Sequence, residues 1–161
     1  MSIQGSRPAE DRSVAVNLIV RGVDQAIGFY EQALGAEVLY KGSMPNGVTL
    51  HAQLRIGRSY VFLSDDVMSH EGLPSASPQK LGGVSSILDL YVDDVDAAFD
   101  RAVKAGGKPL GPVENAFYGD RVGMVTDPYG HVWSLATTVE TLTSEQLYQR
   151  MMEHFSEMQG A

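Results

Sequence analysis

The chain repeats one sequence pattern, and the two copies are separated by 72 residues. Residues 18–26 return as residues 90–98, and Ala33 and Gly35 return as Ala105 and Gly107. A solenoid usually needs at least about three stacked units, so a long period that occurs twice does not suit one. The repeat instead predicts a duplicated module whose two copies pack together, and it allows equivalent positions to be compared.

Bulk composition narrows the class of protein. A chain of 161 residues has room for one compact domain, or for two half-domains that share a core. Its net charge of −8 opposes binding to nucleic acid or to an anionic membrane. The absence of cysteine excludes disulfides, thiol catalysis and Cys-ligated zinc. The polar first twelve residues resemble neither a signal peptide nor a membrane anchor, so we expect a cytoplasmic protein.

Hydrophobic periodicity predicts the order β-α-β-β-β in each copy, and therefore an α+β fold of two tandem modules. Asn46-Gly47 and Gly57-Arg58 are suited to the hairpin turns of the first copy. We expect the strands and helices of the first copy at 14–20, 23–34, 36–40, 48–56 and 59–63. Those of the second copy are expected at 85–92, 95–105, 108–113, 121–126 and 131–136.

Segment boundaries follow from this order. The predicted segments are a flexible N-terminus (1–13), the first module (14–65), a linker rich in Pro, Gly and Ser (66–84), the second module (85–138) and a C-terminal helix (139–161). Thr143 and Gln146 form a capping box at the start of that last helix. Its apolar stripe either packs on its own domain or forms a dimer contact, and we expect a homodimer.

Several short motifs carry a resemblance to a known family. They are Ala-Ile-Gly-Phe-Tyr at 26–30, Leu-Gly-Ala-Glu at 34–37 and Asp-Pro-Tyr-Gly-His at 127–131. Their order and spacing resemble the vicinal oxygen chelate superfamily, which includes glyoxalases, bleomycin-resistance proteins and extradiol dioxygenases. The resemblance spans about residues 14–150 and implies that each module curls into a half-barrel.

Three further segments are similar to the PhnB-like branch of that superfamily. They are His-Ala-Gln-Leu-Arg-Ile-Gly at 51–57, Leu-Ser-Asp at 63–65 and Gly-His-Val-Trp-Ser-Leu-Ala-Thr at 130–137. A fold that hosts many chemistries does not by itself specify a function.

The resemblance also implies where a divalent metal would bind, on the first and fourth strands of each module. Counted in this chain, the four family positions are occupied by Ala15, Phe62, Ile87 and Ser134. Three of these side chains cannot ligate a metal, and a serine hydroxyl is a poor ligand. We therefore predict no cofactor, unless a rearranged site uses Asp65 or Asp89, the carboxylates nearest to a shifted alignment.

Strand alternation predicts which side chains line a cavity. Leu18, Val20, Leu90 and Val92 should face the helices, which leaves Ala15, Asn17 and Ile19, with their equivalents Ile87, Asp89 and Tyr91, on the concave side. On the third strand, Leu50, Ala52 and Leu54 should pack on the helix, and Thr49, His51, Gln53 and Arg55 should face the cavity. A constant spacing of 72 makes Arg121, Gly123 and Val125 the equivalents of Thr49, His51 and Gln53.

The predicted cavity lining is apolar and aromatic with a few polar groups, as in a small-molecule pocket. The predicted ligand-binding residues are Asn17, His51, Gln53, Tyr60, Phe62, Asp89, Tyr91, Tyr118, Arg121 and Ser134. His51 is a candidate general acid or base, or else a hydrogen-bonded strand residue. Asp89 is a second catalytic candidate, and Arg121 is its expected partner, in a ligand clamp or in a purely structural ion pair. We predict that Asp93, Asp94 and Asp96 cap a helix, that His131 flanks a turn and that Trp133 lies in the core.

Two classes of function remain open from the sequence. The first is a metal-free module that binds or sequesters a hydrophobic or aromatic small molecule, which the lost ligand positions favour. The second is an enzyme of the lyase, isomerase or dioxygenase type, with a rearranged metal site or with His51 or Asp89 in acid–base chemistry. The polar groups on the cavity face keep this second class open, and a pure scaffold role has little support.

Overall fold

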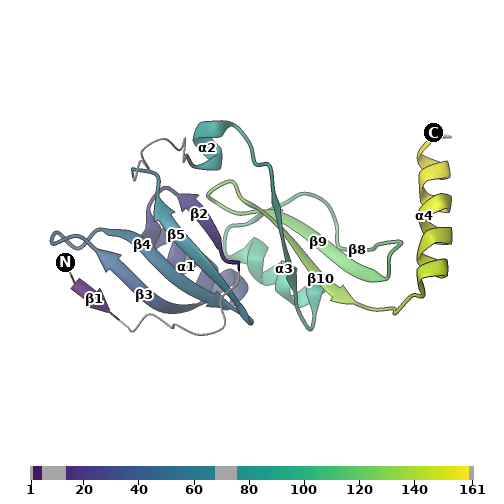
Figure 1. The fold of residues 1–161 in the computed structure, drawn as a ribbon, viewed down its shortest axis with the longest axis horizontal. Coiled ribbons are helices and arrows are strands. Elements are labelled where there is room, and N and C mark those ends of the chain that lie inside the picture. Colours follow the sequence, from purple (N-terminus) through teal and green to yellow (C-terminus); the bar gives the residue numbers. More distant parts are fainter. Residues whose placement is uncertain (1, 5–13, 68–75, 160–161) are drawn as a thin grey trace.

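The computed structural model describes residues 2–4, 14–67 and 76–159, which form two sheets, each covered by a helix (Figure 1). The first sheet has the strand order β1 (Ser2–Gln4), β3 (Glu37–Ser43), β4 (Thr49–Ile56), β5 (Ser59–Asp65), β2 (Val16–Val20). The second has the order β6 (Ile87–Tyr91), β10 (Val132–Thr138), β9 (Asp120–Thr126), β7 (Lys108–Pro109), and β8 (Glu114–Asn115) also pairs with β9. The helices are α1 (Val23–Leu34), α2 (Pro78–Leu81), α3 (Val95–Lys104) and α4 (Ser144–Gln159).

Both sheets are mixed in the same way. In the first, β2 runs parallel to β5, and in the second, β6 runs parallel to β10, while the remaining pairs are antiparallel. A parallel pair needs a crossover connection, which α1 and α3 begin in the first and second copies. The α+β fold of two β-α-β-β-β units with open, curved sheets is thus confirmed. Strand β1 was not predicted from the sequence, and residues 5–13 of the expected N-terminal segment lie outside the described residues.

Local sequence explains where the two crossover helices begin and end. Gly22 precedes α1 with φ 85°, a conformation that favours glycine, and its N–H donates to Asp65 Oδ2 at 3.0 Å. Gly35 follows the same helix in the left-handed region, with φ 65°, a conformation that favours glycine. Asp94 caps α3 by accepting a hydrogen bond from the Ala97 N–H at 3.0 Å, which confirms a capping role for this member of the acidic cluster.

The core lies where α1 and α3 pack on their sheets and on each other. Leu18, Val20 and Trp133 are buried there, as alternation predicts, and Leu90 packs against the same cluster. Phe29 and Tyr30 of α1 contact aromatic side chains of the second half, so one apolar core serves both sheets. Burial of this shared surface stabilises both halves together.

A buried carboxylate ties the two halves together. Asp127 Oδ2, in the β9–β10 turn, accepts the Tyr30 hydroxyl at 2.6 Å and the Trp133 indole N–H at 3.0 Å. Its Oδ1 accepts the backbone N–H groups of Tyr129 and His131. Burial and the adjacent charge of Asp127 raise the pKa of Tyr30 well above its ordinary value, so this phenol keeps its proton and remains a donor.

A second buried carboxylate binds the described end of the predicted linker, of which residues 68–75 lie outside the described residues. Asp66 accepts hydrogen bonds from the backbone and hydroxyl of Ser77, just before α2, and forms ion pairs with Lys80 at 3.0 Å and Arg21 at 3.6 Å. Burial acts to raise the pKa of Asp66, but the bonds from Lys80 and Ser77 outweigh it and hold that pKa below its ordinary value.

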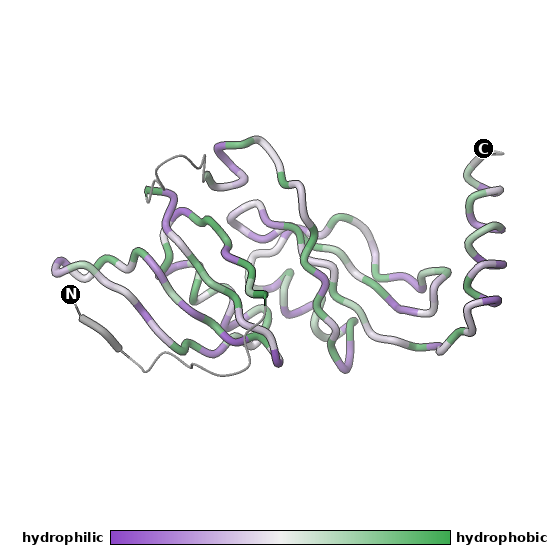
Figure 2. The backbone as a smooth tube through the Cα atoms, in the orientation of Figure 1, coloured by the Kyte–Doolittle hydropathy of each residue, from purple (hydrophilic) through white to green (hydrophobic). Residues whose placement is uncertain are grey.

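Helix α4 stands apart from both sheets at one end of the molecule (Figure 1). The predicted capping box is confirmed, because Thr143 and Gln146 exchange hydrogen bonds of 2.9 and 3.2 Å. Apolar and polar residues alternate along the helix (Figure 2), and Leu147 and Phe155 of the predicted stripe are exposed. No helix in the described ranges has the length and apolar character that a bilayer span requires.

Candidate functional site

A β-bulge in β4 decides which of its side chains reach the concave face, defined for each sheet as the face turned away from its helix. In the pairing of β3 with β4, Gly42 lies opposite His51 and Ser43 lies opposite Thr49, so Leu50 is the extra residue. Thr49 therefore faces α1, where its hydroxyl donates to Asp24 at 2.8 Å. The prediction that Thr49 lines the cavity was wrong, since alternation was carried through the bulge.

The bulge also changes the equivalence between the two copies. Ala52 pairs with Leu63, and Gly123 pairs with Leu135, which makes Ala52 and Gly123 equivalent although they are 71 residues apart. His51 and Gln53 therefore correspond to Val122 and Met124 rather than to Gly123 and Val125. The predicted equivalences for these two residues were wrong by one position.

Arg121 lies on the helix side of the second sheet. Its guanidinium binds both carboxylate oxygens of Asp96 on α3, each at 2.8 Å, and also donates to Asn115. The predicted pair between Asp89 and Arg121 was wrong. Asp96, predicted as a simple helix cap, is instead the partner of this arginine, and hydrogen bonding to Arg121 keeps its pKa below the ordinary value.

A chain of hydrogen-bonded polar side chains crosses three strands of the first sheet on its concave face. Ser64 of β5 donates its hydroxyl to Asn17 Oδ1 of β2 at 3.0 Å. His51 Nδ1 of β4 lies 3.3 Å from the Ser64 oxygen. Because the Ser64 proton is directed to Asn17, His51 Nδ1 is the donor to Ser64, which makes Nε2 the basic nitrogen in the neutral ring. We call these three residues the polar relay.

Aromatic rings flank the polar relay. The His51 ring lies 5.9 Å from that of Phe62 and 6.3 Å from that of Tyr40, measured between ring centroids. Gln53 pairs with Tyr40 on one side and with Phe62 on the other. It is only 2% exposed, and its Oε1 accepts no hydrogen bond from any residue that the structure describes. An unpaired buried carbonyl costs free energy, so Gln53 favours a partner with an N–H or O–H group.

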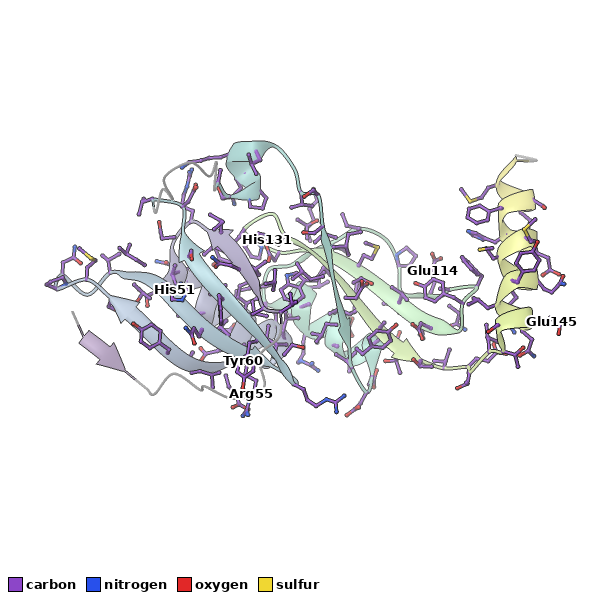
Figure 3. The ribbon with its side chains drawn as sticks, in the orientation of Figure 1. His51, Arg55, Tyr60, Glu114, His131 and Glu145 are labelled. Carbon is purple, nitrogen blue, oxygen red and sulfur yellow. The ribbon has the colours of Figure 1, made fainter. Side chains whose placement is uncertain are left out.

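The remaining candidates of the first sheet lie toward its other end. Figure 3 shows Tyr60 and Arg55 together at that end, with His51 farther along the same sheet. Arg55 forms an ion pair with Glu37 of β3. Tyr60 is half-buried and pairs with Arg55 in register.

The concave face of the second sheet is acidic and aromatic. Tyr91 of β6 donates its hydroxyl to Asp120 Oδ2 of β9 at 2.8 Å, and this bond is the main reason why the pKa of Tyr91 is raised. The pKa of Tyr118 is raised by burial, and then by the charges of Asp120 and Asp89. Asp89 itself is exposed and accepts no hydrogen bond from any described residue. Ser134 pairs with Asp89 in register on the same face and is buried.

Two pockets border these faces. One, of about 250 Å³, lies on the second sheet against Val122 and Met124, with Tyr118 at its side. The other, of about 410 Å³, lies between Asn17 and Ile19 of β2 and the segment 76–86. His131 also lines this second pocket, and its Nε2 lies 3.0 Å from the Ile19 carbonyl, so the predicted turn-flanking residue additionally joins the two halves.

The residues at the family's metal positions do not fit a divalent ion. Ala15, Phe62 and Ile87 offer carbon atoms only, and Ser134 offers one hydroxyl. Asp65, considered for a rearranged site, already accepts the N–H groups of Gly22 and Val67. Among the described residues, no three His, Asp or Glu side chains converge in a group that could hold an ion.

Sequence reasoning missed several members of these clusters. Ser64 follows Phe62 by two residues, but the predicted strand ended at residue 63, whereas β5 continues to Asp65. Alternation along the full strand would have identified it. Asp120 follows Tyr118 by two residues but lies at the start of β9, where the predicted strand began one residue later. Tyr40 was placed in a strand, yet its proximity to His51 depends on the irregular register between β3 and β4.

Known proteins are similar to this chain over most of its length. An uncharacterized protein of Mycobacterium tuberculosis (strain H37Rv) is 38% identical over 139 residues, which cover 86% of this chain and 82% of that protein. The structure of TioX from Micromonospora sp. ML1 has a TM-score of 0.65 at 23% identity, with 80% of this chain and 99% of that chain covered.

A metal-containing structure shares the same fold. The fosfomycin resistance protein FosX from Listeria monocytogenes, complexed with Mn(II) and sulfate, has a TM-score of 0.61 at 16% identity. That match covers 88% of this chain and 98% of FosX. The family model for the "Glyoxalase/Bleomycin resistance protein/Dioxygenase superfamily" matches residues 12–135. The chain therefore belongs to the glyoxalase/bleomycin resistance protein/dioxygenase superfamily.

Proposed function

We propose that this protein binds or sequesters a hydrophobic or aromatic small molecule without a metal ion, on the concave face of its first sheet. The polar relay between Tyr40 and Phe62 carries the proposal. Aromatic walls supply affinity through burial, while a few fixed donors and acceptors orient the ligand. Gln53 adds a buried acceptor that a ligand N–H or O–H group would satisfy.

The wider setting of this proposal follows the sequence. We assign the chain to the PhnB-like branch on the segments 51–57, 63–65 and 130–137, and we place it in the cytoplasm as a homodimer. Segments 14–65 and 85–138 are the two modules, joined by the linker 66–84. Nucleic acid and membranes are not partners in this proposal, because the net charge of −8 opposes both.

The first test is metal content and ligand binding in the same preparation. Protein purified without chelator or affinity tag is challenged with zinc, nickel, manganese and ferrous iron, and its metal is measured by elemental mass spectrometry. We expect no tightly held ion. A panel of neutral aromatic compounds is then screened by NMR, and we expect shifts at Tyr40, His51 and Phe62. One ion held tightly per chain would overturn the metal-free proposal.

A substitution tests the polar relay. His51→Ala should weaken binding about tenfold, the effect of losing roughly 1.4 kcal/mol of hydrogen bonding. His154→Ala, on exposed α4, is the matched histidine control and should leave affinity unchanged. Equal affinity of His51→Ala and the unaltered protein would remove the relay from the proposal.

The relay also favours one alternative, an enzyme of the lyase, isomerase or dioxygenase type. His51 Nδ1 donates to Ser64, so Nε2 is the nitrogen that can accept a proton from a substrate. Asp89, the other acid–base candidate, lies on the second sheet. Loss of turnover with retained ligand binding in His51→Ala would support this alternative.

A further inference from the structure

The concave face of the second sheet carries two carboxylates, Asp89 and Asp120, that form no ion pair within the described part of the chain. Asp89 is exposed and forms no ion pair with a described residue. Asp120 is 7% exposed, and its carboxylate is bonded to a neutral phenol, that of Tyr91. A carboxylate with so little solvent contact is stabilised by a nearby positive charge.

Aromatic and apolar surface lies beside these carboxylates. The pocket of about 250 Å³ is lined by apolar and aromatic residues that include Leu110, Tyr118, Val122 and Met124. Tyr91 is 64% exposed on the same face, although its hydroxyl is fixed by Asp120. Phenol rings held in this way can accept a cation on their faces.

Equivalent positions in the first sheet carry a different chemistry. Asn17, His51 and Ser64, the polar relay, correspond to Asp89, Val122 and Ala136 in the second sheet. The hydrogen-bonded chain is thus replaced by two apolar side chains and one carboxylate to which no described residue donates a hydrogen bond. The two concave faces are therefore suited to different parts of a ligand, or to different ligands.

We propose that the second sheet binds a protonated organic amine, with its charge between Asp89 and Asp120 and its apolar body in the pocket over Val122 and Met124. The two tyrosines contact the cation and the adjoining carbon atoms. This inference rests on the proposed small-molecule function and names the chemical class that its second face accepts. Glu114 of β8, labelled in Figure 3, also lines the pocket and adds to the negative potential.

Two probes of equal shape test the charge. 1-Naphthylmethylamine is a cation at neutral pH, and 1-naphthalenemethanol is its neutral counterpart. We expect the amine to bind at least about tenfold more tightly, with NMR shifts at Asp89, Tyr91, Tyr118 and Met124, and to weaken as salt is added. Equal affinities, or shifts of the amine elsewhere, would overturn the inference.

Variants separate a specific site from general attraction to an acidic protein. Asp89→Asn should weaken the amine about tenfold and leave the alcohol unchanged, because this exposed side chain has no described partner whose loss would disturb folding. Asp100→Asn, on the exposed side of α3, removes the same charge away from the face and should change neither affinity. An equal effect of the two substitutions would contradict the proposed site.

The same experiment distinguishes this inference from the function on which it rests. If the neutral probe binds at Tyr40 and Phe62 while the amine gains nothing from Asp89, the small-molecule function stands and the amine site is wrong. If neither probe binds, and no neutral aromatic compound in the panel binds, both proposals fail.

Discussion

The two halves of this molecule share a backbone fold but carry different polar side chains on the concave faces of their sheets. On the first sheet, Ser64 is hydrogen-bonded both to His51 and to Asn17. On the second, Tyr91 and Asp120 form a bond that leaves Asp89 with no described donor. The helix-facing residues of the core, such as Leu63 and its equivalent Leu135, remain apolar in both halves. A duplicated fold can therefore change one face of a sheet while the other keeps the core intact.

The halves also differ in the side chains through which they contact each other. Tyr30 of α1 crosses to Asp127 of the second half, whereas its equivalent on α3 is Ala102, which has no side chain long enough to return the contact. The joint is therefore one-sided. Beside the contact of His131 with the Ile19 carbonyl, side-chain donors of both halves converge on the Asp127 carboxylate. We expect the largest effects at Asp127.

Asp127→Ala should reduce the free energy of unfolding by about 3–5 kcal/mol, because it leaves buried donors of both halves unpaired. Urea denaturation measures the loss. Tyr30→Phe removes only the bridging bond and should cost about 1–2 kcal/mol. Asp100→Ala is the exposed control. A loss below about 1 kcal/mol for Asp127→Ala would show that apolar packing, not this carboxylate, joins the halves.

Gly123→Ala tests the packing difference between the sheets. An added Cβ would lie 2.6 Å from Phe99 and 2.9 Å from Val113, whereas the first sheet has Ala52 here and Ile27 in place of Phe99. We expect a loss of about 1–3 kcal/mol from overpacking. Adding Phe99→Ile, which copies the first half, should recover part of it. Thermal melts of both single variants and the double variant measure the coupling, and strictly additive losses would contradict this account.

Asp66→Asn tests a difference between the segments that follow β5 and β10, the last strands of the two modules. Asp66 holds the chain after β5, while the equivalent Thr138 leads toward α4 without such a clamp. The pKa of Asp66 in the folded protein lies below its ordinary 3.8, so its stabilising effect is present above that value and is lost as pH falls through the lowered pKa.

We therefore expect Asp66→Asn to be less stable at neutral pH and to lose less of its remaining stability on acidification below about pH 5. Denaturation curves recorded from neutral to acidic pH measure both effects, with Asp100→Asn as the control. If the free energy of unfolding of Asp66→Asn changed with pH in parallel with that of the unaltered protein, the proposed stabilisation by the Asp66 carboxylate would be contradicted.

Much of the fold follows from local sequence, but less of the site does. The repeat, the turn at Asn46-Gly47 and the capping box at Thr143 all depend on neighbouring residues, and the structure has them where predicted. The pairing of Arg121 with Asp96 does not depend on neighbouring residues, because the packing of α3 on β9 brings the two side chains together. Long-range pairs of this kind are fixed by the assembled core, so alternation along a single strand could not select Asp96 over Asp89.

The bulge at Leu50 has a consequence for transferring residue roles by fixed spacing. The extra residue changes the spacing between equivalent residues from 72 to 71. The segment 127–131 is one residue longer than its equivalent, 56–59, and this restores the spacing of 72. Because the two length changes cancel, residues at both ends of the repeat keep a spacing of 72, and a constant spacing looks valid. Within residues 51–56, however, every equivalence based on 72 is wrong by one residue. Phe62 and Ser134 lie beyond that window and remain true counterparts. The comparison of metal positions is therefore unaffected. The equivalent of His51, in contrast, changes from Gly123 to Val122.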